Sequence, residues 1–200
     1  NSGVDLSPFD NDGDGIVDAV AIIHQGNGQE ATGDTTDIWS HSWSLSSAGY
    51  SSNSRKFGSV KVDNYIVQPE LNSHTSEMAE IGVIAHEFGH VLGAYDFYDT
   101  DYKENNQQSG TGTWDLMDMG CYNGSPSGSV PAHHNAYTKI QFGWAQSTVL
   151  DTPGPMVLSP VISSQQVYRV NTSTENEYYL FENRKKTGFD SNIRGEGMIV

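Results

Sequence analysis

Residues 76–96 read SEMAEIGVIAHEFGHVLGAYD, and this stretch decides how the rest of the chain is interpreted. Apolar side chains recur through it at helical spacing, namely Met78, Ile81, Ile84, Ala85, Phe88, Val91 and Leu92. Thr75 or Ser76 can serve as the N-cap, and Gly93 favours a stop because glycine readily adopts left-handed backbone angles. The pattern therefore predicts one long helix over residues 76–92.

The second half of this predicted helix carries side chains that suit zinc. Residues four apart on a helix lie about 40° apart round the axis and about 6 Å apart along it, so His86 and His90 can aim two imidazoles at one point. Gly93 lets the chain turn back, so that Asp96 can supply a third ligand. Glu87 lies about 100° round from His86, close enough to act on a metal-bound water without being a ligand. Three protein ligands with one open position indicate a catalytic zinc site.

A helix that merely carries two surface histidines is the alternative interpretation. A bare H-E-x-x-H arises by chance in roughly one chain in a hundred of this length and composition. The alternative must also account for the helical setting, for Gly93 three residues after the second histidine, and for Asp96 three residues beyond that. We therefore prefer the zinc site.

A second metal-binding pattern lies at residues 10–18, which read DNDGDGIVD. Carboxylates stand at positions 1, 3, 5 and 9 of an EF-hand-like loop, with glycine at position 6 and a backbone carbonyl at position 7. The corresponding residues are Asp10, Asp12, Asp14, Ile16 and Asp18. A strand follows instead of a helix, so we expect an isolated Ca²⁺ loop that stabilises the start of that strand. A solvated Asp/Gly turn is the alternative.

The composition indicates a globular protein and argues against several partners. The chain has 200 residues and a formal charge of -15, which repels nucleic acid and anionic lipid. No run approaches the roughly 20 apolar residues that span a membrane, so we expect no membrane insertion. Heavy use of Ser, Thr, Asn, Gly and Tyr suits a secreted, extracellular protein. Cys121 is the only cysteine, which excludes an intrachain disulfide, and we interpret it as a small buried residue.

Strand-like segments flank the helix, so the predicted fold class is α+β. Strands are expected over residues 16–24 (buried), 57–62, 65–71, 167–170, 177–183 and 197–200, and a second helix over residues 132–143. We predict two regions, a catalytic core over residues 1–146 and a β-rich segment over residues 147–200.

The motifs resemble those of a known family. The spacing H-E-x-x-H-x-x-G-x-x-D looks like the zinc signature of the metzincin clan, in the branch whose third ligand is Asp. Residues 112–120, GTWDLMDMG, are similar to the methionine turn of immune-inhibitor-A-type zinc metallopeptidases, which makes Met117 the turn methionine. Residues 11–18, 38–41, 66–70, 142–144 and 178–184 also look like that family. The resemblance covers nearly the whole chain.

The resemblance implies a metzincin-like core with a twisted sheet, a long active-site helix, a methionine turn and a C-terminal helix. Met117 would act by packing, because a thioether is a poor zinc ligand beside His and Asp. Many metzincins place Tyr two residues after this methionine, but here that position is Met119, so no such Tyr is carried over. The edge strand that holds an extended peptide would be residues 57–62, with residues 65–71 inside the sheet.

The implied function is a secreted zinc metalloendopeptidase that acts on protein or peptide substrates. Zinc would acidify its water and polarise the scissile carbonyl, while Glu87 transfers the proton. A complete metzincin domain has further elements before residue 16, so we expect a fragment of a precursor with an inhibitory pro-segment upstream. A catalytically silent calcium-dependent binding module and a zinc hydrolase for non-peptide bonds are the alternatives. Glu87 argues against the silent module, which has no need of it.

Overall fold

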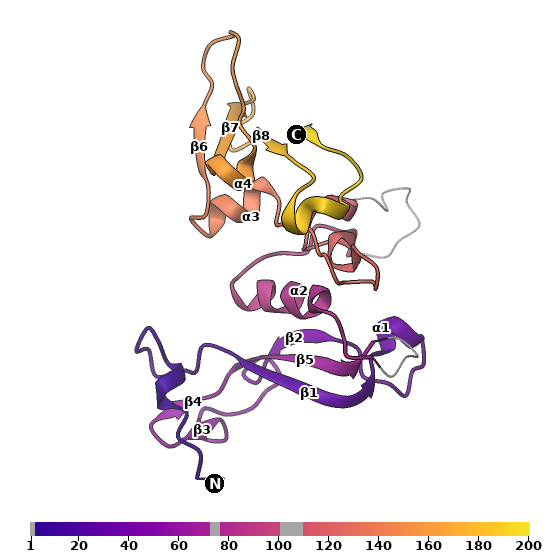
Figure 1. Cartoon of the computed structure of the whole chain (residues 1–200). Helices are drawn as coiled ribbons and strands as arrows, with labels where there is room; N and C mark the ends of the chain where they lie inside the picture. Colours follow the sequence, from indigo (N-terminus) through magenta and orange to yellow (C-terminus); the bar gives the residue numbers. More distant parts are fainter. Residues whose placement is uncertain (1–2, 73–76, 101–109) are drawn as a thin grey trace. The chain divides into compact units, whose positions relative to one another are not determined.

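The computed structural model describes residues 3–72, 77–100 and 110–200, which form an α+β fold (Figure 1). The chain divides into two compact units, one from Asn1 to Gly93 and the other from Ala94 to Val200. The predicted boundary after residue 146 falls inside the second unit and stays a prediction. Among the described helices, none is long and apolar enough to cross a membrane.

A three-stranded sheet organises the first unit. Its strands run in the order β1 (Val20–Asn27), β5 (Asn64–Leu71) and β2 (His41–Ser44). β1 runs parallel to β5, and β2 runs antiparallel to it. The middle of β5 is buried at Ile66, Val67 and Gln68, as a strand with neighbours on both sides requires. The prediction that residues 65–71 form an inner strand is confirmed.

The edge strand beside β5 is not the predicted one. Residues 57–62 divide between β3 (Lys56–Phe57) and β4 (Val60–Lys61), which pair with each other in a separate two-stranded sheet. Gly58 lies between them with a φ of 62°, a conformation that glycine adopts without strain. The predicted edge strand is therefore wrong, and β2 takes that place. Its sequence, HSWS, has little intrinsic strand preference, so only the pairing with β5 identifies it.

The first strand is shifted and more exposed than predicted. β1 begins at Val20, whereas Ile16 forms only an isolated bridge with Lys61. Ile22 and Ile23 are 46% and 54% exposed, so the prediction of a buried strand over residues 16–24 is wrong in its start and in its burial. The β-branched residues correctly predicted that a strand forms here. The sequence of one strand does not determine which other elements cover it, and so does not determine its burial.

The predicted long helix is α2 (Ile81–Val91), which begins later than residue 76. The residues before it pair with the end of β5: Met78 bridges to the last residue of that strand, and the Ala79 amide donates to the Glu70 carbonyl at 2.9 Å. These backbone groups are therefore unavailable to an earlier helical turn, and the predicted start is wrong. The expected caps at residues 75 and 76 lie outside the described residues.

α2 packs on β5 and β2, so it covers the sheet at its inner and edge strands (Figure 1). Its end agrees with the prediction: Leu92 is the C-cap, and Gly93 follows with a φ of 98°. A short helix, α1 (Gln29–Thr32), and a 3-10 turn, η1 (Ser7–Phe9), complete this unit.

A four-stranded sheet organises the second unit. The strand order is β6 (Gln146–Val149), β7 (Gln166–Asn171), β8 (Tyr178–Arg184) and β9 (Gly197–Ile199), with β6 parallel to β7 and the other pairs antiparallel. The strands predicted over residues 167–170, 177–183 and 197–200 are confirmed within one or two residues at their ends. A small apolar core contains Ala136, Ala145, Val161 and Val167.

The second helix is shorter than predicted. α3 (Ala136–Gln141) starts after Asn135, whose side-chain oxygen accepts a hydrogen bond from the Thr138 amide at 2.9 Å. This N-cap excludes residues 132–134 from the helix. The remaining elements are α4 (Val161–Ser164) and three 3-10 turns, η2 (Gly112–Trp114), η3 (Met119–Tyr122) and η4 (Gly188–Asn192).

A buried charge network joins α3, β8 and η4. Arg184 lies at its centre and is 1% exposed. Its guanidinium donates to Asp190 at 2.6 and 2.8 Å and to Glu182 at 2.9 Å. Glu182 also accepts from Lys139 at 2.7 Å. Two cations and two anions are thus enclosed with mutual hydrogen bonds, the condition under which buried charges are tolerated.

This network predicts a loss of stability in acid. Burial by itself raises the pKa of Asp190, but the hydrogen bonds and charge of Arg184 more than offset this and hold the pKa below 3.8. A carboxyl group with a depressed folded-state pKa stabilises the fold above its unfolded-state pKa, and this stabilisation is lost as pH falls through the folded-state pKa. We therefore expect the urea midpoint to fall as pH decreases below about 4.

The measurement is urea unfolding of the metal-free chain in chelator, from about pH 6 to about pH 2.5. Asp190→Asn should be less stable throughout and should show a flatter pH profile. A parent midpoint that stays constant or rises toward acid would contradict the prediction.

Candidate metal centre

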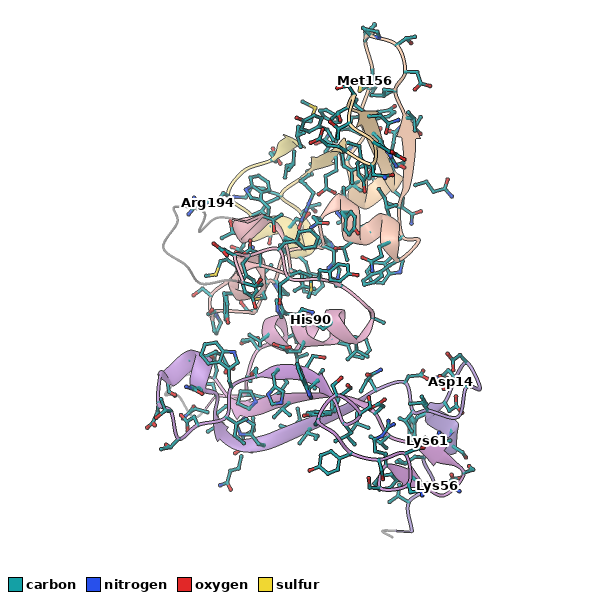
Figure 2. All side chains as sticks on the ribbon, turned by 180° about the vertical axis from the view of Figure 1, so that it is seen from behind. Asp14, Lys56, Lys61, His90, Met156 and Arg194 are labelled. Carbon is teal, nitrogen blue, oxygen red and sulfur yellow. The ribbon has the colours of Figure 1, made fainter. Side chains whose placement is uncertain are left out.

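The structure brings the three predicted zinc ligands together. The ligand atoms of His86, His90 and Asp96 all lie within 4.8 Å of one another. The two imidazole rings have centroids 4.9 Å apart and are perpendicular. His86 is 8% exposed and Asp96 is half-buried, so the group is partly withdrawn from water. Figure 2 labels His90 on α2.

This convergence follows from local geometry. His86 and His90 are one helical turn apart on α2, so both side chains leave the same face. The left-handed conformation at Gly93 then ends the helix, and the chain reaches Asp96 within three residues. Glu87 is also 8% exposed and lies next to His86 on the same helix.

The donor set fits zinc better than calcium or magnesium. Two imidazoles and one carboxylate are typical of catalytic zinc sites, whereas the hard cations prefer oxygen ligands alone. Three protein ligands also leave a coordination position for water or substrate, as catalytic zinc sites require.

By sequence, Met117 and Met119 are both candidates for the methionine of the turn, but their environments differ. Met117 is 0% exposed, whereas Met119 is 54% exposed. The Met117 carbonyl accepts a hydrogen bond from the Phe97 amide at 2.9 Å. Phe97 directly follows Asp96, so the backbone of Met117 is bonded beside the third candidate ligand.

A buried carboxylate, which the sequence did not single out, supports this turn. Asp115 is fully buried and accepts hydrogen bonds from the Met117 amide at 3.2 Å, from the Asn135 amide at 3.1 Å and from the Thr111 hydroxyl at 3.2 Å. The Asn135 side chain donates a further short bond. Burial raises the pKa of Asp115, and these hydrogen bonds oppose that rise. Its position two residues before Met117 is the only sequence signal that could have indicated it.

The acidic loop at residues 10–18 brings three of its four carboxylates together. Ligand atoms of Asp10, Asp12 and Asp18 lie within 4.8 Å of one another. Asp14 is not part of this group, and its carboxylate accepts from the Ile16 amide at 2.7 Å. Figure 2 labels Asp14 on this loop and Lys61 on the neighbouring strand, where the Lys61 amide donates to the Gly15 carbonyl at 2.9 Å.

One atom of this loop suggests a missing partner. Asp10 Oδ1 is buried and has no hydrogen-bond partner among the described residues, whereas Asp10 Oδ2 accepts from the Gly15 amide at 3.0 Å. A hydrogen bond from the Asn11 side chain and another from its amide lower the pKa of Asp18, which favours its ionised form. An oxygen-rich, anionic group of this kind suits Ca²⁺.

Cys121 is buried, which confirms its interpretation as a small buried residue. Its amide donates to the Asp118 carbonyl at 3.2 Å within η3, the turn that follows Met117.

The comparisons with known proteins match one peptidase family. The family model described as immune inhibitor A peptidase M6, catalytic domain, matches residues 7–146. This range contains His86, His90, Asp96, Glu87 and Met117.

Three curated relatives agree with this match. Immune inhibitor A of Bacillus thuringiensis subsp. alesti is 31% identical over 179 residues, which cover 76% of this chain and 25% of that protein. Pre-pro-metalloprotease PrtV of Vibrio cholerae serotype O1 is 34% identical over 139 residues, covering 63% of this chain and 14% of the relative. A protein of Arthroderma benhamiae, named as a secreted metallopeptidase, is 30% identical over 84 residues, covering 36% and 12%. The chain thus spans a quarter or less of each relative.

Proposed function

Because this chain belongs to the immune inhibitor A family of M6 peptidases, we propose that it is a secreted, zinc-dependent endopeptidase acting on protein substrates. One observation carries the proposal: the ligand atoms of His86, His90 and Asp96 lie within 4.8 Å of one another. Glu87 lies between the two histidines in the sequence of α2. A metzincin-like core is part of the proposal, supported by α2 and by the buried Met117 that follows it.

His86, His90 and Asp96 would hold the zinc ion. When bound, zinc supplies a Lewis acid that polarises a carbonyl group and lowers the pKa of water to about 7. Glu87 accepts the proton of the attacking water and delivers it to the nitrogen of the leaving amine, so the peptide C–N bond breaks without a covalent enzyme intermediate. The burial of Glu87 strengthens its electrostatic interactions in this role.

β2 is the proposed binding strand for the substrate backbone. Within the described sheet β2 pairs only with β5, so β2 is one of the two edge strands. An extended peptide can add to such an edge through main-chain hydrogen bonds, which suits an enzyme that accepts many sequences.

Secretion and a pro-segment are part of the same proposal. One relative is named as secreted, and another is named a pre-pro-metalloprotease. We therefore expect the chain to derive from a secreted precursor whose pro-segment inhibits the zinc site until it is removed.

The test of the proposal is zinc content measured together with hydrolysis of a generic unfolded protein. The parent chain should bind about one zinc per chain and cleave, and a chelator should abolish cleavage. His90→Ala should lose zinc and activity together. A well-folded parent that binds no zinc would refute the site. One that binds zinc without cleaving any protein would favour the silent binding module or the zinc hydrolase for non-peptide bonds.

We also propose that residues 10–18 bind calcium through Asp10, Asp12 and Asp18, with Asp14 and the Ile16 carbonyl as further candidates. The buried, unpartnered Oδ1 of Asp10 supports this proposal. Calcium at about 100 times its Kd would stabilise the fold by about 2.7 kcal/mol. This corresponds to a rise in Tm of about 5–10 °C for a chain of this size.

Thermal unfolding with and without Ca²⁺ tests the calcium site. Asp10→Asn should abolish the rise in Tm, while Asp151→Asn, an exposed carboxylate outside the loop, should retain it. An equal response in the two variants would place calcium elsewhere.

A further inference from the structure

We propose that Asp115 is a positioning residue for the zinc site: its carboxylate holds the two residues that clamp the backbone of Phe97, and this clamp sets the orientation of Asp96. The inference rests on the proposed function, because it concerns the third ligand of the same zinc site.

Both backbone groups of Phe97 are held. Its amide donates to the Met117 carbonyl at 2.9 Å, and its carbonyl accepts from the Thr111 amide at 3.2 Å. Its ring packs edge-on against Tyr137, with centroids 5.9 Å apart. Because Phe97 is joined directly to Asp96, a fixed peptide at Phe97 restricts the direction in which the Asp96 side chain leaves the backbone.

The same two clamping residues are held by one carboxylate. Asp115 Oδ1 accepts from the Met117 amide at 3.2 Å, and Asp115 Oδ2 accepts from the Thr111 hydroxyl at 3.2 Å. The backbone amide and the side-chain amide of Asn135 fill the remaining positions, so each carboxylate oxygen has two donors. In Asp115→Asn, an NH₂ group would replace one carboxylate oxygen and would face two of these donors, so those two hydrogen bonds would be lost.

Gly110 restricts Phe97 independently of Asp115. A Cβ atom at residue 110 would lie 1.4 Å from the Phe97 carbonyl oxygen, a distance that no side chain can occupy. The backbone of residue 110 therefore packs directly on the Phe97 peptide. Substitution of Gly110 must displace this peptide without removing the buried carboxylate.

A purely structural Asp115 and a positioning Asp115 predict different results. In the first case a substitution lowers stability only, and folded molecules bind zinc as the parent does. In the second case the folded variant binds zinc more weakly, since loss of groups that orient a metal ligand typically costs 10–100-fold in metal affinity.

The experiment measures Zn²⁺ affinity by competition with a chelator, and the visible absorption of bound Co²⁺, on chains that near-ultraviolet circular dichroism shows to be folded. Asp115→Asn and Gly110→Ala should raise the Kd for Zn²⁺ about 10-fold or more and change the Co²⁺ band. Val167→Ala is the matched control, a truncation at a fully buried position of β7. It should lower stability and leave both metal readouts unchanged.

Folded Asp115→Asn and Gly110→Ala chains with the parent's Kd and Co²⁺ spectrum would overturn the inference. So would a Val167→Ala chain that changes both readouts to the same degree. Thr111→Val keeps the backbone bond to Phe97 and removes the hydroxyl contacts to Asp115 and Asp118. It should show a smaller rise in Kd and decides the matter if the other variants do not fold. A folded parent that binds no Zn²⁺ would instead refute the proposed function.

Discussion

Glu87→Gln is expected to reduce proteolytic activity by about 10²–10⁴-fold while the chain retains about one zinc ion. The amide cannot accept the proton of the attacking water, and it cannot return a proton to the leaving amine. His86, His90 and Asp96 remain unchanged, so the metal should still bind. Gln also matches Glu in volume, which matters because Glu87 is buried.

The measurement is kcat/KM on a protein substrate with zinc content determined on the same sample. Glu77→Gln is the matched control, since Glu77 is an exposed glutamate just before α2. It should keep the parent's activity. A Glu87→Gln chain that cleaves at more than a tenth of the parent's rate would exclude the role as general base, and one that loses its zinc would give Glu87 a role in metal binding.

Arg184→Met is expected to lower the free energy of unfolding by about 3–5 kcal/mol. The substitution fills much of the same volume but leaves the Asp190 and Glu182 carboxylates buried without the guanidinium that donates to both. The Lys139 ammonium remains bonded to Glu182 only, so two anions share one buried cation. An uncompensated buried charge costs more than the intact ion pair contributes.

Arg194→Met is the matched control, because the Arg194 side chain is exposed (Figure 2). It should change the free energy of unfolding by less than about 0.5 kcal/mol. With an m-value of about 2–3 kcal/mol/M, the urea midpoint of Arg184→Met should fall by about 1–2.5 M relative to that control. Equal midpoints for the two variants would show that the buried network contributes nothing to stability.

The candidate zinc ligands could be predicted from the sequence because their geometry is local. His86 and His90 are brought together by one turn of helix, and Gly93 allows the turn toward Asp96. Helical spacing and glycine conformation depend on neighbouring residues, and the structure places the three ligand groups within 4.8 Å. The acidic loop is a weaker case of the same kind, since three of its four carboxylates converge and Asp14 does not.

The sheet could be predicted only in part. β5 follows from its β-branched residues, but the partners of a strand lie far away along the chain, and residues 41–44 have no pattern that identifies an edge strand. The predicted start of α2 was wrong for the same reason. The residues before Ile81 pair with the end of β5, so their backbone groups are unavailable to the earlier helical turn that the periodicity predicted.

The sequence by itself determined the family, and it predicted the helix, its candidate ligands and the candidate base Glu87, because these depend on spacing along one segment. Only the tertiary structure decided which polar residues are buried together. Asp115 meets Asn135 across 20 positions, and Lys139 meets Glu182 across 43. A buried carboxylate and an exposed one have the same letter in a sequence, and only the folded chain establishes which donors surround it in place of water.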